Sequence, residues 1–394
     1  MKRKIDLLFL GILAAVFLAL PAGSVINTLS GNTALFYENR SPAPLPDLRF
    51  ESFWNGTFST QADAFISDRI PGRDAMIRAD TALGMALGRP VSHDVVTAAH
   101  QLFPYHGYLT WDVSYTTDKA AAMAQPLAAL HKQITGYGGT MVYLGIPQQY
   151  SYFRNSYPDY LDNRVWNLDA MTSAFSDALA LQGVPFLNML ETYAELGYPA
   201  EFYSATDHHY NYRGMLCAYQ TLMQDLNART GADLKIYTEE DLIFEFLSEP
   251  FLGSQNRKIY GLWDNDEKLE IAHLKDPISF TRMDNGVEVP PTLYTFPDPG
   301  EYATYSVYMG GDVAETIIET DRPDLPSLLV VGDSFTNAME TLLWASFDET
   351  RSLDYRYYSG PALSAYIADY QPDIVVILRD DTSYLSDTGN GNLS

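Results

Sequence analysis

A serine and a histidine–aspartate pair are the residues of this sequence whose surroundings best suit covalent chemistry. Ser334 follows the apolar run Ser327–Val331 and the dipeptide Gly332-Asp333. A serine directly after a strand lies at the carboxyl edge of an α/β sheet, where the next helix directs its first amides at the site. Such a position suits a nucleophile and the oxyanion that forms when it attacks. By itself, Gly-Asp-Ser is also a common turn or helix cap.

A second short segment supplies the partners that a serine nucleophile needs. The hydroxyl requires a base that takes its proton, and the base requires an acceptor that fixes its tautomer. Asp207 and His209, in the segment Ala205–Gly214, can fill these roles. Together with His208 they could also bind a metal ion, but adjacent histidines of one loop rarely converge on one ion. We therefore predict a catalytic triad of Ser334, His209 and Asp207, with no metal and no other cofactor.

Alternating strands and helices must bring these two segments together. Short apolar runs predict the strands Thr140–Ile146, Val184–Asn188, Ser327–Val331 and Gln371–Leu378. Helical spacing predicts helices over residues 118–136, 165–182 and 213–226, and two more over 53–89, broken at 70–72. This alternation indicates an α/β domain. Residues 238–319 are rich in aromatic residues, Gly, Pro and Asp, and alternating runs such as Glu301–Tyr308 predict a largely β insertion.

The N-terminal segment predicts a location outside the cytoplasm. The basic cluster Lys2-Arg3-Lys4 precedes an apolar run from Leu7 to Ile26. A run of about 20 apolar residues spans a bilayer as a helix, and basic residues before it stay on the cytoplasmic side. No clean cleavage signal follows, although cleaved secretion stays open. We predict a transmembrane signal anchor over residues 1–28, a proline-rich linker over 29–52 and the main domain over 53–394.

The composition limits the functions that this chain can have. Of its 394 residues, 46% are hydrophobic and 19% are charged, which predicts a compact fold. The net charge of -25 argues against a nucleic-acid partner, because the phosphates would be repelled. The single cysteine, Cys217, can form no internal disulfide.

Taken together, three segments resemble motifs of the SGNH or GDSL hydrolase superfamily. Gly332-Asp333-Ser334 looks like the nucleophile block of that superfamily, and Asp207-x-His209-Tyr-Asn211-x-x-Gly214 looks like its acid and base block. Gln371–Ile377 resembles the strand that leads into the block carrying the family's asparagine. The resemblance implies a three-layer α/β fold with a parallel central sheet.

Two departures from the common pattern narrow this resemblance. The Asp/His block precedes the serine block, a circularly permuted order found in the AlgX/AlgJ-like alginate O-acetylation proteins and in the bacterial DHHW family. Phe53, Gly56 and Asp68–Arg73 look like the N-terminal motif of that subgroup. After Leu378 the chain has Arg379-Asp380, where the common family has Gly-x-Asn.

Because Arg379-Asp380 replaces Gly-x-Asn, the sequence does not identify the groups that would donate to the oxyanion together with the Ser334 amide. Gly360 and Asn337 are candidates for this role. Arg379 could replace the missing donor or bind an anionic substrate group, and it could equally pair with the neighbouring Asp380 or Asp381. His208 is a candidate for substrate contact.

The resemblance implies an O-acetyltransferase or acetylesterase that acts on a cell-surface or secreted polysaccharide through an acyl-enzyme on Ser334. It also implies a membrane-bound O-acyltransferase (MBOAT) partner that delivers acetyl groups across the bilayer. Two other classes stay open. One is a non-catalytic, membrane-anchored scaffold or carbohydrate-binding component, and the other is a factor like the teichoic-acid D-alanylation proteins, which would carry an aminoacyl group.

Overall fold

The chain divides into two units in the computed structural model, which describes residues 2–31, 34–98, 100–105, 113–386 and 393. The smaller unit contains Met1–His93 and Asn256–Asp264, and the larger one contains Asp94–Gln255 and Asn265–Ser394. Residues 53–93 thus group with the N-terminal segment. The predicted boundaries of anchor, linker and main domain stay predictions.

The smaller unit is mainly helical. Its helices are α1 (Lys2–Leu29), α2 (Phe50–Trp54), α3 (Thr57–Ser67) and α4 (Arg73–Ala86), with the short strand β1 (Val91–Ser92) and the 3₁₀ helix η1 (Phe36–Glu38). The break between α3 and α4 lies at the predicted Ile70-Pro71-Gly72. Among the helices that the structure describes, none is both long and apolar enough to cross a membrane. The predicted transmembrane anchor therefore receives no support, although α1 covers most of residues 1–28.

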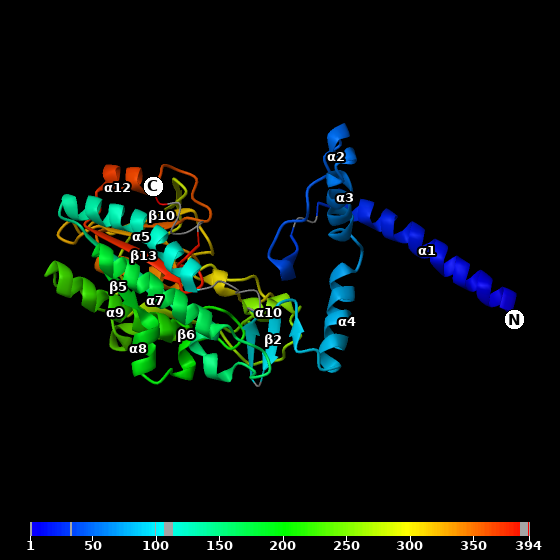
Figure 1. Ribbon diagram of the computed structural model, residues 1–394, viewed down its shortest axis with the longest axis horizontal. Coiled ribbons are helices and arrows are strands. Elements are labelled where there is room, and N and C mark those ends of the chain that lie inside the picture. The colour runs from blue at the N-terminus through cyan, green and yellow to red at the C-terminus, as the bar shows by residue number, and fades with distance from the viewer. Residues whose placement is uncertain (1, 32–33, 99, 106–112, 387–392, 394) are drawn as a thin grey trace. The chain divides into compact units, whose positions relative to one another are not determined.

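An eight-stranded sheet forms the centre of the larger unit, in the order β5-β4-β13-β11-β12-β10-β8-β9 (Figure 1). The strands are β4 (Thr140–Ile146), β5 (Phe186–Asn188), β8 (Thr281–Asp284), β9 (Val287–Val289), β10 (Glu315–Glu319), β11 (Leu328–Gly332), β12 (Glu349–Asp354) and β13 (Ile374–Asp380). The strands from β5 to β12 in this order are parallel. Three strands, β10, β8 and β9, extend the sheet in antiparallel pairing. The prediction of a parallel sheet is therefore correct for the strands from β5 to β12 only.

Helices cover both faces of this sheet (Figure 1). One face carries α5 (Val113–Gly136), α7 (Val165–Gln182) and α12 (Leu363–Tyr370), and the other carries α8 (Met189–Glu195), α9 (Tyr212–Thr230) and α11 (Phe335–Leu343). Successive strand residues point to opposite faces. Val142 and Leu144 of β4 accordingly share one core with α9 and α11, whereas the ring of Tyr143 lies 5.2 Å from that of Phe175 in α7. The predicted three-layer α/β arrangement is present.

The predicted insertion over residues 238–319 is only partly β. It contributes β8, β9 and β10 to the main sheet, and β6 (Leu242–Phe246) pairs with β7 (Glu270–Leu274) in a separate two-stranded sheet. The run Glu301–Tyr308, predicted as β from its alternation, instead contains the 3₁₀ helix η5 (Tyr305–Val307). Residues three apart lie on one side of a 3₁₀ helix. The rings of Tyr305 and Tyr308 therefore pack together in the core, with their centroids 5.0 Å apart.

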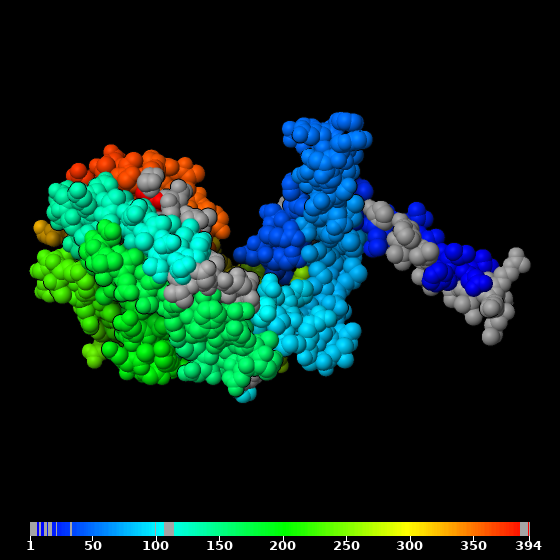
Figure 2. All heavy atoms as spheres, in the orientation of Figure 1, coloured from blue at the N-terminus to red at the C-terminus, as the bar shows by residue number. Residues whose placement is uncertain are grey.

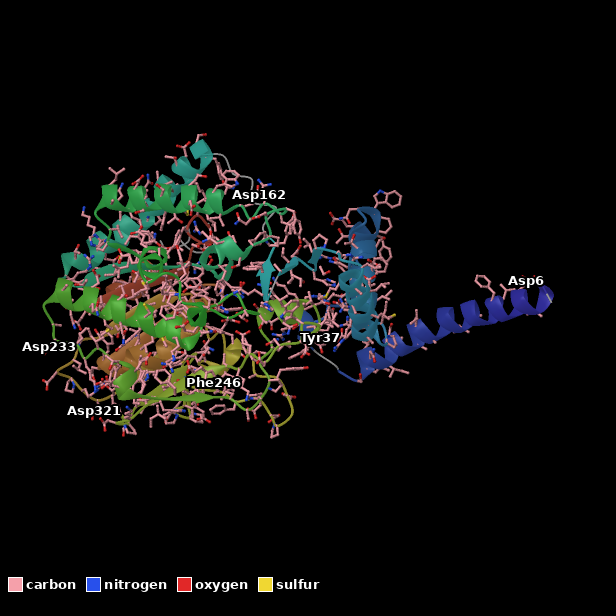
Figure 3. All side chains as sticks on the ribbon, turned by 90° about the horizontal axis from the view of Figure 1, so that it is seen from below. Asp6, Tyr37, Asp162, Asp233, Phe246 and Asp321 are labelled. Atoms are coloured by element: carbon pink, nitrogen blue, oxygen red, sulfur yellow. The ribbon has the colours of Figure 1, made fainter. Side chains whose placement is uncertain are left out.

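Residues of α5 (cyan) and of the C-terminal part around α12 (orange to red) lie side by side on the surface of the larger unit that Figure 2 shows. Asp162, Asp233 and Asp321 are exposed and lie at its periphery in Figure 3. Exposed carboxylates such as these contribute to the strongly negative net charge. The remaining short elements of this unit are β2 (Val95–Ala98), β3 (Gln101–Pro104) and α6 (Gln149–Tyr152), and α10 (Ser254–Lys258) begins in it.

Candidate active site

The serine lies in the tight turn between β11 and α11, at the carboxyl edge of the sheet. β11 ends at Gly332, and Ser334 is the residue before the first turn of α11. Asp333 Oδ1 accepts the backbone N–H of Phe335 at 3.0 Å, which fixes the turn. A Cβ on Gly332 would lie 2.3 Å from Thr336 Cγ2 and 2.7 Å from the carbonyl oxygen of Leu378. Only glycine therefore allows this close passage of the chain.

This crowding predicts the effect of Gly332→Ala. The added methyl group meets the backbone of β13, which has little room to move, so strand and turn must shift. We expect a loss of about 1–3 kcal/mol in the free energy of unfolding, the usual cost of overpacking a core. Urea titration measures it, with Gly136→Ala as control, since a Cβ there meets no atom within 4 Å. If both variants were as stable as the wild type, the crowding inferred at Gly332 would be contradicted.

Asp207 and His209 lie in the loop that precedes α9. Ser204 Oγ accepts the backbone N–H of Asp207 at 2.8 Å, and Asp207 Oδ1 accepts the N–H of His209 at 3.0 Å. Asp207 Oδ2 accepts the N–H of Ser254 at 2.6 Å, which joins the loop to the start of α10. The carboxylate is thus held by the backbone on two sides. Ser254 was not predicted, because its part depends on a contact between segments 47 residues apart.

The structure brings the three predicted triad residues together. His209 Nε2 lies 2.7 Å from Ser334 Oγ, and His209 Nδ1 lies 2.6 Å from Asp207 Oδ1. Asp207 and His209 are only 2% and 4% exposed. Burial by itself raises the pKa of Asp207, but the charge and hydrogen bond of His209, with His208 and the Ser254 amide, hold that pKa well below its ordinary value. Asp207 therefore stays a carboxylate that can orient the imidazole.

Two aromatic rings pack on the imidazole of His209. The ring of Tyr305 in η5 is stacked on it, with a centroid distance of 3.7 Å and an interplanar angle of 6°. Phe335, the first residue of α11, lies at 4.7 Å with a tilted ring. With its two nitrogens bound to Asp207 and Ser334, the imidazole has a fixed position. The sequence analysis missed Tyr305, since nothing in its neighbourhood distinguishes it from the other tyrosines.

Arg379, the first of the four further candidates, lies next to the turn that carries Ser334. Arg379 is 5% exposed, donates from Nη1 to the carbonyl oxygen of Gly332 at 3.4 Å and has Nε 3.8 Å from Asp333 Oδ2. Arg379 therefore supports, from within the core, the turn that carries Ser334. In these contacts the carboxylate beside the Arg379 guanidinium is that of Asp333, whereas the sequence suggested an ion pair with Asp380 or Asp381.

The other three candidates have partners of their own or lie apart. Asn337 is buried and donates from Nδ2 to Asp312 Oδ1 at 3.1 Å. His208 Nδ1 lies 2.7 Å from Ser254 Oγ, and its ring centroid is 3.8 Å from that of His209. Gly360 is exposed, and no described contact joins it to the triad. His208 thus packs on His209 and binds Ser254, whereas Asn337 contacts Ser334 through its backbone N–H.

Asp207, His208 and His209 also satisfy a simple distance test for metal binding. One ligand atom from each of them lies within 4.8 Å of the others. Their hydrogen bonds give a different reason for this spacing. Both ring nitrogens of His209 and both oxygens of Asp207 already have partners in the described contacts. The arrangement fits an acid–base relay without a metal ion.

A cluster of buried carboxylates surrounds Arg379. Burial and the neighbouring Asp380 raise the pKa of Asp333 to about 6, although Arg379 opposes this. Burial and Asp380 also raise the pKa of Asp381 to about 7. Burial acts in the same sense on Asp380, but the hydroxyls of Ser383 and Thr382 and the charge of Arg379 lower its pKa. Asp380 therefore carries the charge while Asp381 takes up a proton near neutral pH.

This cluster predicts a pH-dependent stability. The pKa of Asp381 is raised from 3.8 to about 7 on folding, so folding favours its protonated form, and stability falls as pH rises between these values. Asp381→Asn keeps the oxygen that accepts the Gln148 N–H. We expect this variant to be more stable than wild type by about 4 kcal/mol at pH 8, and near wild type at pH 4.

Urea titrations at the two pH values measure this difference. Asp380→Asn is the matched control, since its carboxylate accepts hydrogen bonds from Gln148 Nε2 and the Thr382 N–H. The lowered pKa of Asp380 gives the opposite sign, so this control should lose stability at pH 8. A gain for Asp381→Asn that is the same at both pH values would contradict the assignment.

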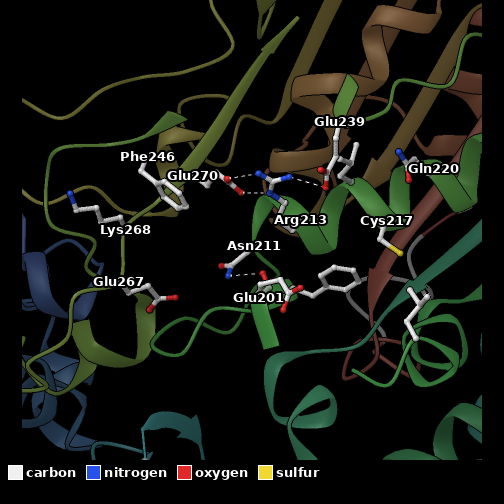
Figure 4. A pocket seen from close by; sticks show the side chains of 13 residues that line it. Glu201, Asn211, Arg213, Cys217, Gln220, Glu239, Phe246, Glu267, Lys268 and Glu270 are labelled. Atoms are coloured by element: carbon white, nitrogen blue, oxygen red, sulfur yellow. Dashed lines mark hydrogen bonds and ion pairs between the residues drawn. The ribbon is translucent and has the colours of Figure 1, made fainter. Parts of the chain in front are cut away.

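A pocket of about 720 Å³ lies on another side of the triad loop (Figure 4). None of the three triad residues lines it. Arg213 points there toward Glu270, with two hydrogen bonds of 2.9 Å, and toward Glu239, with an ion pair of 2.8 Å. Asn211 donates to the carbonyl oxygen of Glu201 at 3.2 Å. Arg213, Glu239 and Glu270 of this wall are thus paired with one another.

Comparisons with known proteins agree with this fold. No family model and no curated protein matches the sequence. Among solved structures, Bacillus cereus PatB1 matches with a TM-score of 0.65 at 21% identity, over 75% of this chain and 98% of that one. A DHHW family protein from Eubacterium siraeum matches with a TM-score of 0.56 at 17% identity, over 77% and 97%. AlgJ of Pseudomonas putida and AlgX of Pseudomonas aeruginosa match with TM-scores of 0.45 and 0.40.

These neighbours are the group that the motifs predicted. The likeness to PatB1 and the DHHW protein shows that the chain shares their α/β fold. At about one fifth sequence identity, this likeness shows the fold alone and assigns no activity to the chain.

Proposed function

We propose that this chain is a serine-dependent acyltransferase or esterase, which moves an acetyl group to a polysaccharide hydroxyl or to water. The observation that carries the proposal is the unbroken hydrogen-bonded series from Asp207 through His209 to Ser334. A binding protein has no physical need to hold these three groups in register.

The geometry supports a two-step reaction. His209 Nε2 takes the proton of Ser334 Oγ while that oxygen attacks the acetyl carbonyl carbon, and Asp207 stabilises the imidazolium that forms. When the tetrahedral intermediate collapses, the leaving group takes the proton from His209, and the acetyl group stays on Ser334. An acceptor hydroxyl then gives its proton to His209 and attacks the acetyl carbon. When this second intermediate collapses, the bond from the acetyl carbon to Ser334 Oγ breaks, and His209 returns the proton to Ser334 Oγ. A sugar hydroxyl gives transfer, and water gives hydrolysis.

The Ser334 amide is well placed as an oxyanion donor. The next three amides are used within the turn, since Phe335 N–H binds Asp333 Oδ1, Thr336 N–H binds the Asp333 carbonyl and Asn337 N–H binds the Ser334 carbonyl. Among the described contacts the N–H of Ser334 has no such partner. Its place at the start of α11 adds the positive end of the helix dipole.

The setting of the reaction is part of the proposal. The basic N-terminus followed by an apolar segment favours an extracytoplasmic catalytic domain attached to the membrane, with a polysaccharide as acceptor and an MBOAT protein as the source of acetyl groups. Fractionation of cells that carry the tagged full-length chain tests the location. Recovery in the membrane fraction, with protease access from outside only, is expected. Recovery in the cytoplasm would contradict it.

The chemistry is tested by acetyl release from p-nitrophenyl acetate with the purified full-length chain. A structure of Bacillus cereus PatB1 holds a sulfonyl adduct, so a sulfonyl fluoride is a suitable second probe of Ser334. We expect turnover that survives a chelator and stops after sulfonylation. Transfer to added oligosaccharides would distinguish a transferase from an esterase. A folded protein that neither turns over nor reacts with the sulfonyl probe would favour the scaffold class, and transfer of D-alanyl groups alone would favour the teichoic-acid class.

A further inference from the structure

The proposed reaction leaves the oxyanion with too few donors. A tetrahedral intermediate is usually stabilised by two or more preorganised donors, and the turn before α11 offers the Ser334 amide. Two side chains that the sequence suggested have partners away from Ser334 Oγ: Asn337 donates to Asp312, and Arg379 donates from Nη1 to the Gly332 carbonyl, with its Nε 3.8 Å from Asp333 Oδ2. A further donor near Ser334 is required.

The hydroxyl of Tyr305 is a buried donor with no partner in the described part of the structure. The side chain is 8% exposed, and its ring is stacked on His209, whose Nε2 binds Ser334 Oγ. A buried hydroxyl without a partner destabilises a fold, and phenylalanine would avoid this cost. The position of this tyrosine, stacked on the imidazole that binds Ser334, points to a hydroxyl partner that is present only during the reaction.

The hydroxyl also has the right protonation state. Burial, with the nearby Tyr210, Tyr308, Asp207 and Asp333, raises the pKa of Tyr305 well above its ordinary value. The phenol is therefore neutral at any working pH and can donate a hydrogen bond. Tyr308, three residues further along, is used differently, because its hydroxyl donates to the carbonyl oxygen of Glu270 at 2.5 Å.

We infer that Tyr305 is a catalytic residue, whose hydroxyl donates a hydrogen bond to the oxyanion formed when Ser334 attacks the acetyl carbonyl. This inference rests on the proposed function. The phenol keeps its proton throughout, so the hydroxyl stabilises charge and takes no part in proton transfer. The stacked ring also keeps the imidazole of His209 aligned with Ser334, which places the hydroxyl and the base in one rigid unit.

Steady-state kinetics of Tyr305→Phe with p-nitrophenyl acetate test the inference. Loss of one oxyanion donor should lower kcat by about 100-fold or more, with KM near the wild-type value, because the interaction forms in the transition state. The melting temperature should equal or exceed that of wild type, since an unpartnered hydroxyl has been removed. A purely structural tyrosine would not combine these two effects.

Tyr308→Phe is the matched control. It loses a hydrogen bond in the same aromatic cluster, so its melting temperature should fall while kcat stays within a few-fold of wild type. Wild-type kcat in Tyr305→Phe would overturn the inference and assign the hydroxyl to a structural partner such as water. If wild type and Ser334→Ala are equally inactive, the proposed function fails, and the inference fails with it.

Discussion

Ser334→Ala should lower kcat/KM for acetyl release by about 10⁴-fold or more. The variant lacks the oxygen that forms the acyl-enzyme, so only the oxyanion donors and substrate binding remain to accelerate attack by water. The fold should survive, because Ser334 is partly exposed and its side chain makes the single described contact with His209. The rate of p-nitrophenol release, measured with circular dichroism and melting temperature, checks both statements.

Ser327→Ala is a control at the residue just before the same strand. Ser327 precedes β11 at the far end of that strand, where its Oγ lies 2.8 Å from Asp373 Oδ2. It should keep its activity. Residual activity of Ser334→Ala above a tenth of wild type would mean that another group is the nucleophile.

Asp207→Asn should lower kcat by about 10⁴-fold while the fold stays intact. An amide in place of the carboxylate offers His209 Nδ1 a donor as readily as an acceptor, so the imidazole is no longer held with Nε2 free to accept the Ser334 proton. The low pKa of Asp207 means that the carboxylate is charged at every working pH. Buried beside His209, its charge is needed when the imidazolium forms.

Asp233→Asn is the matched control, because it makes the same change in net charge at an exposed position. It should behave as wild type. The Asp207 variant should also react slowly with the sulfonyl fluoride, since that reaction needs the same activated oxygen. Normal labelling of Asp207→Asn with slow turnover would place the role of Asp207 after acylation and contradict its assignment as the orienting group.

The sequence predicted the central part of the fold because its signals are local. β4 follows the predicted Thr140–Ile146, and α7 follows the predicted 165–182, since an apolar strand or an amphipathic helix is encoded within its own residues. The proximity of Ser334 and His209 was also predictable. Ser334 directly follows a strand of the sheet, and the family resemblance pairs it with the Asp/His segment. The structure supplied the distances, 2.7 Å from His209 Nε2 to Ser334 Oγ and 2.6 Å from His209 Nδ1 to Asp207 Oδ1.

Other parts of the site depend on contacts between distant segments, which a sequence does not display. Arg379 was considered with its neighbours Asp380 and Asp381, whereas its place beside Asp333 arises because β13 and β11 are adjacent in the sheet. Tyr305 lies 96 residues after His209, in a run whose alternation predicted a strand. Its position beside the triad depends on the stacking of its ring on the imidazole, a contact between distant segments.

The most direct test of the account is the detection of the acyl-enzyme itself. The full-length chain is mixed with p-nitrophenyl acetate, quenched in acid within the burst phase and digested, and the acetylated peptide is located by mass spectrometry. The account predicts a single acetyl group on Ser334, absent from Ser334→Ala and strongly reduced in His209→Ala. Turnover with no acetyl group on Ser334, or with the acetyl group on another residue, would contradict the central claim.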